Sequence, residues 1–385
     1  MTPDGLRPRA TIDIDGGGRT IFVISPQPWD GFRVSKHHYA SLLAEKGHRV
    51  FFFNPPRLDG ISGRIDISPT DIAGVSQVAY RTFFPYRLKF RFRPVFNRLM
   101  RLQARRLLRA TGGAPDIVWD FDNAFQFADL SVFGAKFAIF HPVDSLPGAR
   151  SHKNADVVLS VSPLFIERTG ITPEYGHVIP HGLGPDYAAY GRRQLAERAY
   201  AGPAGRRPRV GYVGNLNHVG VDWRTLLVVI RENPGIDFVF FGPYSAPAVP
   251  VEDLRACPNC DLRGARPARE ILREADGFDA WLICYDRTLT ADGAINSHKI
   301  LEYLATGKTV IANRIDSYVD SPLIAMCDDE RNRDYPALFR KVMTSLHKWN
   351  DDAKRDARIG FALDHQYSRH LATIAHILRD AHAQA

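Results

Sequence analysis

A stretch near the end of the sequence, residues 296–313, combines a lysine and a glutamate at a spacing suited to a charged ligand. It reads NSHKILEYLATGKTVIAN, which predicts a helix that stops at Gly307 and an apolar strand after it. Ser297 can cap this helix, whereas Lys299 opposes the helix dipole unless an anion such as a diphosphate binds there. Glu302 can accept hydrogen bonds from the vicinal hydroxyls of a ribose or sugar. The alternative is a surface pair that contributes only about 0.2–0.5 kcal/mol.

A second candidate site lies in GYVGNLNH, where Gly214 and Asn215 follow an apolar strand. Glycine lets the backbone approach a phosphate closely, and the next helix N-terminus offers free amides and the positive end of its dipole. A turn also needs glycine for its own geometry, so the residue alone leaves both interpretations open.

The segment from Arg81 to Arg109 contains ten lysines or arginines and no acidic residue, interleaved with aromatic residues. Within it, RPVFNRLMRLQARRLLR predicts a helix with Arg98, Arg101 and Arg105 on one face and a mainly apolar opposite face. Such a helix suits an anionic membrane surface, and the alternative is a solvated helix whose apolar side covers a sheet. The net charge of +8 also suits nucleic acid, but the charge is local and no recognisable nucleic-acid motif occurs, so we expect no nucleic-acid partner.

The elements that must position these residues alternate between strand and helix in two successive runs. Apolar strands such as TIFVI, FAIF and VGYV alternate with helical patterns. The alternation predicts an α/β fold with two doubly wound, Rossmann-like domains of parallel strands facing a cleft. The expected boundaries are a flexible leader (1–19), an N-terminal domain (20–185), a linker rich in Gly, Pro and Arg (186–208), a C-terminal domain (209–365) and a terminal helix that can cross back to the N-terminal domain (366–385).

Composition is typical of a soluble globular protein. The 385 residues are 45% hydrophobic and 24% charged, with no run of about 18 apolar residues and no apolar core of a signal peptide. Four scattered cysteines form no disulfide framework, so we expect a reducing, cytoplasmic compartment. Cys257 and Cys260 form a CxxC, but the remaining cysteines do not complete a zinc ligand set, and we expect no metal site.

The stretch SHKILEYLATGKTVIAN closely resembles the donor-site segment of GT-B glycosyltransferases, where a K-x-x-E-Y-L-A-x-G-K-P-V-V-A pattern lies in the C-terminal lobe. GYVGN, GFDAWLICY, VLSVSPLFIERTG and VIPHGLG resemble other parts of that family. SKHHYASLLAEKGHRVFFFNPP resembles the first helix of bacterial cell-surface polysaccharide transferases, including the teichuronic-acid type. The similarity covers roughly residues 20–380.

This resemblance implies a hexosyl- or glucuronosyltransferase that uses a nucleotide diphosphate sugar, with a UDP-sugar favoured, and that needs no cofactor or metal. The N-terminal domain would bind a lipid-linked or growing cell-surface glycan as acceptor. The enzyme would then be cytoplasmic and peripheral, at the inner face of the cell membrane. The donor-binding residues that the resemblance implies are Gly214, Asn215, Tyr285, Ser297, His298, Lys299 and Glu302.

The segment FHPVDSLPG resembles a region of the xanthan-type glucuronosyltransferases, inverting GT-B enzymes in which an aspartate is the catalytic base. The matching residue is Asp144, which would take the proton from the attacking acceptor hydroxyl. Its alternative role is a helix cap or turn residue before Pro147. Competing acceptor-side candidates at strand or helix ends are His37, His38, Asp120 and Asp122.

Two departures from the family-four pattern leave the stereochemical outcome open. Retaining members carry a second glutamate where Ala294 stands, and a basic residue where Asn217 and His218 stand. The alternative enzyme class is a GT-B-fold nucleotide-sugar epimerase, which would keep Lys299 and Glu302 but convert the donor without an acceptor.

Overall fold

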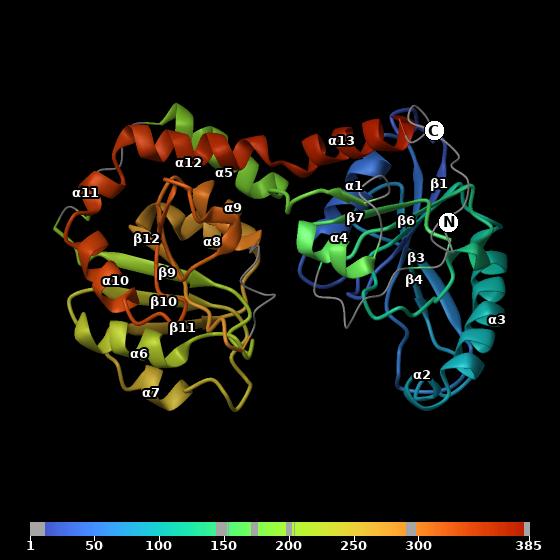
Figure 1. The fold of residues 1–385 in the computed structure, drawn as a ribbon, viewed down its shortest axis with the longest axis horizontal. Helices are drawn as coiled ribbons and strands as arrows, with labels where there is room; N and C mark the ends of the chain where they lie inside the picture. Colours follow the sequence, from blue (N-terminus) through green and yellow to red (C-terminus); the bar gives the residue numbers. More distant parts are fainter. Residues whose placement is uncertain are drawn as a thin grey trace. The chain divides into compact units, whose positions relative to one another are not determined.

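The computed structural model divides the chain into two compact units, each built on its own sheet (Figure 1). Unit 1 comprises residues 1–180 and 367–385, and unit 2 comprises residues 181–366. The two Rossmann-like, mainly parallel domains that the strand and helix alternation predicts are therefore confirmed. The residues that the structure describes are 12–143, 152, 154–170, 176–197, 202–203, 205–289 and 298–380.

The sheet of unit 1 has eight strands in the order β3-β4-β2-β1-β5-β6-β7-β8. Every neighbouring pair is parallel except β3 with β4, which form an antiparallel pair at one edge. The strands are β1 (Thr20–Ile24), β2 (Arg49–Phe53), β3 (Ile65–Pro69), β4 (Val75–Tyr80), β5 (Ile117–Asp120), β6 (Phe137–Phe140), β7 (Val157–Ser160) and β8 (Gly176–Val178).

Side-chain alternation along the strands of unit 1 separates two helical layers. Phe51 and Phe53 of β2 belong to a core cluster with α3, whereas Phe52 between them stacks on His37 of α1. The helix α13 packs on α1. The helical elements are α1 (Ser35–Glu45), α2 (Leu88–Arg91), α3 (Arg93–Thr111), η1 (Leu130–Phe133), α4 (Pro163–Thr169) and α13 (Tyr367–Asp380).

The sheet of unit 2 has six parallel strands in the order β11-β10-β9-β12-β13-β14. The strands are β9 (Arg209–Val213), β10 (Asp237–Phe241), β11 (Cys260–Gly264), β12 (Ala280–Ile283), β13 (Thr309–Ala312) and β14 (Ile324–Met326). The helices are α5 (Pro185–Ala196), α6 (Trp223–Glu232), α7 (Val251–Arg255), α8 (Ala268–Glu274), α9 (His298–Leu304), α10 (Tyr335–Met343), α11 (Leu346–Trp349) and α12 (Asp352–Asp364), with 3₁₀ turns η2 (Ala275–Gly277) and η3 (Asp316–Tyr318).

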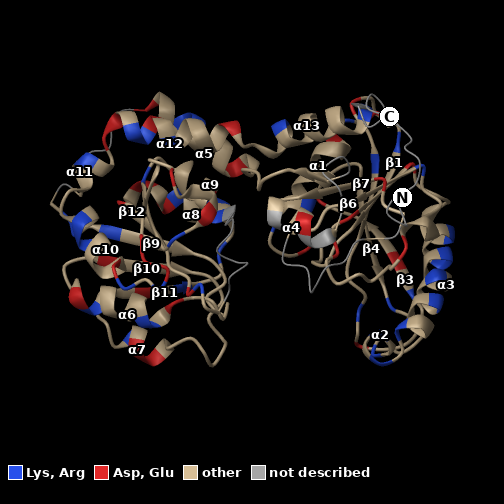
Figure 2. Cartoon of the chain, in the orientation of Figure 1, with Lys and Arg blue, Asp and Glu red and all other residues tan. Residues whose placement is uncertain are grey.

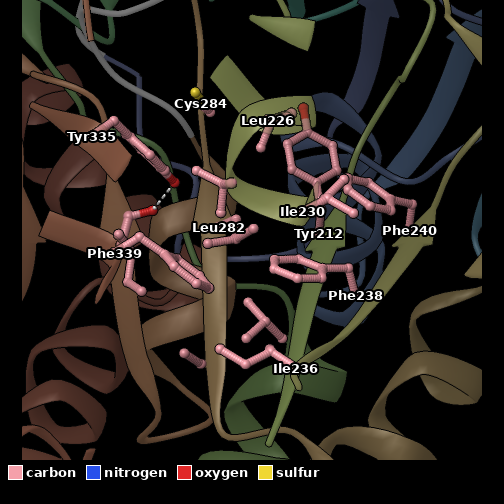
Figure 3. Close-up of a cluster of buried hydrophobic side chains, with 14 of the residues drawn as sticks. Tyr212, Leu226, Ile230, Ile236, Phe238, Phe240, Leu282, Cys284, Tyr335 and Phe339 are labelled. Carbon is pink, nitrogen blue, oxygen red and sulfur yellow. Dashed lines mark hydrogen bonds between the residues drawn. The ribbon is translucent and has the colours of Figure 1, made fainter. Parts of the chain in front are cut away.

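Two apolar clusters cover the two faces of this sheet. In the first, Phe339 of α10 stacks on Phe238 of β10 with ring centroids 5.6 Å apart, and the Tyr335 hydroxyl donates to the Ile311 carbonyl at 3.0 Å (Figure 3). The second cluster joins α5, α8 and α9 to the other face. Buried aromatic and branched side chains on both faces explain why the strands read as continuous apolar runs.

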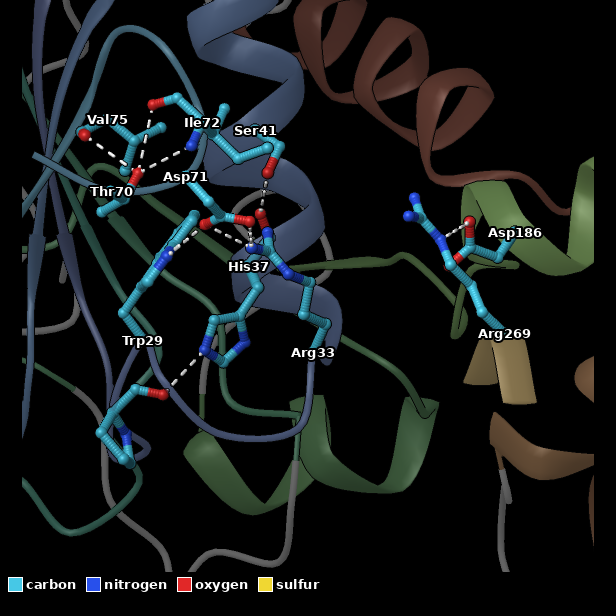
Figure 4. Close-up of polar contacts among 11 residues, drawn as sticks. Trp29, Arg33, His37, Ser41, Thr70, Asp71, Ile72, Val75, Asp186 and Arg269 are labelled. Carbon is cyan, nitrogen blue, oxygen red and sulfur yellow. Dashed lines mark hydrogen bonds and ion pairs between the residues drawn. The ribbon is translucent and has the colours of Figure 1, made fainter. Parts of the chain in front are cut away.

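Residues Pro185–Ala196 form helix α5, which differs from the linker expected over residues 186–208. Proline is well tolerated in a first helical turn, so the Gly and Pro content of this segment does not prevent a helix. Gly191 allows close packing, because a Cβ at this position would lie 3.1 Å from the Ala305 carbonyl oxygen. Asp186 also pairs with Arg269 of α8 at 3.1 Å (Figure 4).

The two passages of the chain that bound unit 2 lie side by side. Leu183 N–H donates to the His365 carbonyl at 2.7 Å, and Leu183 and Gln366 form a parallel bridge.

Among the described helices, none is long and apolar enough to cross a membrane.

Candidate active site

The first and fourth strands of unit 2, β9 and β12, are neighbours at the point where the strand order reverses. Ligands of doubly wound sheets bind outside the carboxyl ends of the strands at such a point. Gly214 directly follows β9 and Tyr285 follows β12 by two residues. The predicted residues of these two loops therefore lie at the position where a ligand site is expected.

Gly214 leaves room for the side chain of Lys299. A Cβ at Gly214 would lie 2.6 Å from Lys299 Cε and 3.1 Å from Tyr212 Cε1. Gly242 contributes to the same packing, since its φ of +147° favours glycine and a Cβ there would collide with the Gly214 carbonyl oxygen. The Lys299 side chain thus lies against the Gly214 turn, whose carbonyl oxygen packs closely on Gly242.

Asn215 organises the loop after this turn. Its Oδ1 accepts a hydrogen bond from Asn217 N–H at 3.1 Å, and its carbonyl accepts from His218 N–H at 3.0 Å. The Asn217 side chain in turn accepts from Ala246 N–H at 2.6 Å. Asn215 therefore shapes the loop, as asparagine commonly does in turns.

Helix α9 is fixed to the end of β9 by Tyr303. The Tyr303 hydroxyl accepts from Val213 N–H at 2.7 Å and donates to the Val213 carbonyl at 3.1 Å. Its ring also stacks on Trp281 of β12, with centroids 4.9 Å apart. The buried residues Ile300, Leu301 and Leu304 hold the rest of the helix in the core. This anchoring positions Lys299 against the Gly214 turn.

Lys299 and Glu302 are both half-buried and close enough to interact electrostatically. Burial raises the pKa of Glu302 to about 7, although the positive charge of Lys299 and a hydrogen bond from Tyr187 of α5 act in the opposite direction. A carboxyl group with this pKa is partly protonated at neutral pH. A ligand that donates hydrogen bonds to the carboxylate would favour its ionised form.

Tyr285 and His218 complete the group from the two loops. Their ring centroids are 5.7 Å apart, and the hydroxyls of Tyr285 and Tyr212 are 3.5 Å apart. The pKa of His218 is lowered mainly by loss of solvent around the ring and, to a smaller extent, by the charge of Lys299. The loop therefore presents a neutral imidazole beside the lysine at neutral pH.

The structure brings together four of the seven predicted donor-site residues, Gly214, Tyr285, Lys299 and Glu302, and places Asn215 at the base of the loop. Ser297 lies outside the described residues, and His298 begins α9 but its side chain is also outside them. Sequence reasoning missed three tyrosines of this site, Tyr187, Tyr212 and Tyr303. Tyr303 lies inside the EYLA motif, so the motif itself could have indicated that Tyr303 belongs to the site.

Comparison with known proteins identifies the fold but no close relative. No family model and no curated protein matches the sequence. Among solved structures, α,α-trehalose 6-phosphate synthase from Burkholderia multivorans is similar with a TM-score of 0.65 and 15% identity over 95% of this chain and 99% of that one. A trehalose-6-phosphate protein from E. coli bound with UDP-2-fluoro glucose has a TM-score of 0.65 and 11% identity, covering 94% and 99%. The Anabaena protein HepE, in complex with UDP and glucose, has a TM-score of 0.61 and 14% identity, covering 94% and 99%.

The chain has the GT-B fold. At these identities the similarity concerns the fold, and the site described above stands on its own geometry. Unit 2 corresponds to the C-terminal GT-B lobe in which the sequence analysis expects the donor, and unit 1 supplies the acceptor-side candidates.

In unit 1 of this GT-B chain, both ring nitrogens of His37 are engaged by backbone groups. Its Nδ1 accepts from Val34 N–H at 3.2 Å and its Nε2 donates to the Pro28 carbonyl at 3.0 Å (Figure 4). The residue is fully buried, and burial lowers its pKa to about 4. This arrangement stabilises the start of α1. His38 is half-buried and stacks on Tyr367 with centroids 4.7 Å apart.

Asp120 and Asp122 shape the turn after β5. The Asp122 carboxylate accepts from Ala124 N–H at 3.0 Å and from Gln126 N–H at 2.8 Å. Asp120 accepts from Asp122 N–H at 2.7 Å and lies 2.9 Å from His152 Nε2. Burial raises the pKa of Asp120. Asp144 lies outside the described residues.

Helix α3 presents the predicted basic face to solvent. Arg98, Arg101 and Arg105 are exposed, while the opposite face, including Phe96 and Leu107, is buried against the sheet. Figure 2 shows the resulting row of basic residues along α3.

Proposed function

We propose that the protein is a glycosyltransferase that moves a sugar from a nucleotide diphosphate donor, with a UDP-sugar favoured, to a lipid-linked or growing cell-surface glycan. The observation that carries this proposal is the position of Lys299 against the Gly214 turn at the reversal point of the unit 2 sheet, with Glu302 of the same helix close enough to interact with it electrostatically. A UDP-containing ligand in two proteins of similar fold supports the choice of nucleotide.

Each group of the site has a role in donor binding that follows from its chemistry. The Lys299 ammonium would stabilise the diphosphate, which also becomes the leaving group, through charge-assisted hydrogen bonds. The Glu302 carboxylate would accept hydrogen bonds from vicinal ribose hydroxyls. Tyr187 and Tyr303 would keep these two side chains in place.

A membrane surface would supply the lipid-linked acceptor. Beside the exposed arginines of α3, large apolar side chains are also exposed around α2 and along α3: Phe90 (84%), Phe92 (53%), Val95 (50%) and Leu102 (42%). Exposed aromatic and aliphatic groups among arginines match the requirements of an anionic leaflet, in which the apolar groups insert and the cations contact the head groups. The enzyme would then act as a peripheral protein at the inner face of the cell membrane.

The direct test measures donor binding by isothermal titration calorimetry with UDP-glucose. Lys299→Ala should weaken binding by about 1.5–3 kcal/mol, because a hydrogen bond to a charged group is lost. Lys341→Ala, which removes an exposed lysine of α10, serves as the matched control. Equal affinities of wild type and Lys299→Ala would remove the assignment of the donor site.

A thermal-shift screen chooses between nucleotides. At equal concentrations, UDP-, GDP- and dTDP-glucose should raise the melting temperature in the order of their affinities, and a ligand at a hundred times its Kd stabilises by about 2.7 kcal/mol. We expect the largest shift with the UDP-sugar. A product formed from the donor alone, without an acceptor, would indicate an epimerase instead.

A further inference from the structure

A cavity of about 360 Å³ lies in unit 1 on the antiparallel pair β3–β4. Its floor is formed by Asp66, Ser68, Gln77 and Ala79, which share one face because Asp66 pairs with Ala79 and Ser68 with Gln77. Its walls come from Pro28 and Asp30, which follow β1, and from residues 54–57, which follow β2. The cavity therefore opens beside the carboxyl ends of these strands, where ligands of such sheets bind.

The two faces of the β3–β4 pair have different partners. Ile65, Val78 and Tyr80 point to the cluster that contains α3, so that face is occupied by the core. The face with Ser68 and Gln77 carries polar groups and forms the floor of the cavity. An edge pair with a polar, hollowed face is suited to hold a polar ligand.

The loop walls of the cavity are held rigidly. Asn54 is buried, its Oδ1 accepts from Trp29 N–H at 2.9 Å, and its Nδ2 donates to Gln77 Oε1 at 3.0 Å. The Trp29 indole N–H donates to Asp71 at 2.9 Å (Figure 4). Pro28, Pro55 and Pro56 add rings of fixed geometry. A site with walls of this kind loses little conformational entropy when a ligand binds.

The polar groups around the cavity include both donors and acceptors. The Gln77 amide nitrogen and the Arg57 guanidinium can donate, whereas the Asp30 and Asp66 carboxylates accept. Asp66 is also paired with Arg64 at 2.8 Å, and this ion pair partly offsets the negative charge that Asp66 presents to the cavity. A sugar hydroxyl both donates and accepts, so it can use this mixture, while the proline rings can contact the C–H groups of a pyranose. A phosphate would meet two carboxylates and one guanidinium, so the lining as a whole is less suited to an anion than to a neutral ligand.

We propose that this cavity binds a neutral sugar unit of the acceptor. That the sugar belongs to an acceptor rests on the proposed glycosyltransferase function. That the ligand is a neutral sugar rests on the cavity alone. The volume falls within the range of small-molecule sites, roughly 300–1,000 Å³. Binding here would select acceptors by a sugar unit that is separate from the donor-binding groups of unit 2.

The test is an NMR titration of the full chain, labelled with ¹⁵N, with maltose, cellobiose and lactose at millimolar concentration. We expect the side-chain amide signals of Asn54 and Gln77 and the backbone signals of Asp66 and Ser68 to move with at least one disaccharide. Glucose 6-phosphate should leave them in place. If none of the three neutral disaccharides moves these signals, or if glucose 6-phosphate moves them instead, the proposal is overturned.

Two substitutions on the same strand make the result specific. Ser68→Tyr fills the cavity from an exposed position and should abolish the shifts caused by the disaccharide. Ile67→Tyr adds the same ring on the opposite face of β3, where the residue is 39% exposed, and should preserve them. Shifts that persist in Ser68→Tyr would place the sugar elsewhere.

A parallel titration with UDP-glucose separates this inference from the proposed function. Signals near Gly214 and Lys299 should respond to UDP-glucose in wild type and in Ser68→Tyr alike. A response to the disaccharide without any response to a nucleotide-sugar would keep the sugar cavity and reject the transferase. A response to UDP-glucose without any response to a disaccharide would keep the transferase and reject the sugar cavity.

Discussion

His37 and His218 each follow the first strand of their unit, and the two residues have opposite surroundings. His37 is fully buried, with both ring nitrogens bonded to the backbone. His218 is exposed, its Nδ1 accepts from Gly220 N–H at 3.1 Å, and its ring faces Tyr285 and the charge of Lys299. A histidine in the first helix of unit 1 thus stabilises the fold, whereas a histidine in the loop after the first strand of unit 2 borders a candidate ligand site.

The aspartates after β5 extend this contrast. Asp122 directs its carboxylate at backbone groups of its own turn, and Asp120 divides its carboxylate between the Asp122 N–H and His152 Nε2. In unit 2, Lys299 and Glu302 interact with each other beside a glycine turn. A polar residue at the end of a strand is therefore a candidate for ligand binding only when its hydrogen-bonding groups are not required by the local backbone.

The largest expected effect concerns the contribution of unit 1 to chemistry. If Asp144 is the base of an inverting transfer, Asp144→Asn should lower kcat by roughly 10² to 10⁴ while the affinity for UDP-glucose stays constant, because the carboxylate acts only in the attack step. Kinetics, calorimetry and the anomeric configuration of the product by NMR measure these quantities.

Asp122→Asn is the matched control for Asp144→Asn. It should lower the melting temperature through the loss of turn hydrogen bonds and leave the turnover of the folded enzyme nearly normal. Normal turnover in a stable Asp144→Asn protein would exclude Asp144 as the base and would direct the search to His38.

The two units should respond to pH in opposite directions. The pKa of His37 is lowered from 6.5 to about 4, so this residue costs stability as the pH falls from 6.5 towards 4. The pKa of Glu302 is raised from 4.5 to about 7, so that residue costs stability as the pH rises from 4.5 through 7. Each effect is at most about 3 kcal/mol.

Scanning calorimetry of His37→Gln and Glu302→Gln measures the two pH effects. His37→Gln should reduce the loss of stability between pH 6.5 and 4. Glu302→Gln should reduce the loss of stability between pH 4.5 and 7. Glu302→Gln should also melt higher than wild type at pH 8 without ligand, yet bind UDP-glucose more weakly. Tighter binding in that variant would mean that the carboxylate does not contact the donor.

Charge reversal on α3 tests whether its exposed face is more than a solvated surface. Changing Arg98, Arg101 and Arg105 to Glu should release the protein from vesicles that contain anionic lipid, since each cation near such a surface contributes about 1 kcal/mol. Replacing Arg231, Arg263 and Arg340 of unit 2 with Glu gives a control of equal charge. Wild type that does not bind the vesicles in a sedimentation assay would reject the membrane surface.

The smallest effect returns to the first comparison. His218→Ala should weaken UDP-glucose binding by about 0.5–1.5 kcal/mol with little change in melting temperature, if its imidazole contributes one hydrogen bond to the ligand. His37→Ala should do the opposite, lowering the melting temperature of the protein while affinity stays constant. Equal effects of the two variants on stability would remove the distinction between the two histidines.

The fold was accessible from the sequence wherever the strands are continuous apolar runs. β2, β9 and β12 fall in this class because parallel strands are buried on both faces. The β3–β4 pair was not predicted, because IDISP and VSQVAY at the sheet edge mix polar and apolar residues. Helix α5 was assigned to a linker because its one glycine and one proline obscured a helical pattern whose packing depends on distant residues.

The candidate site could be predicted only in part, for a related reason. Lys299 and Glu302 share one short motif, so their proximity follows from helical spacing. Tyr187 and Glu302 are far apart in the sequence, and no local pattern links α5 to α9. The burial of His37 likewise depends on Pro28 and on the aromatic residues of β2, which spacing alone does not reveal.

The side-by-side passage of Leu183 and Gln366 has a consequence for which part of the chain can be exchanged as a unit. Because unit 2 begins and ends at paired backbone segments, it is a continuous segment within the sequence of unit 1 whose two ends already meet. Domain insertion is tolerated best when the termini of the inserted domain are close together. Residues 181–366 could therefore be exchanged as one segment while residues 1–180 and 367–385 of unit 1 stay unchanged.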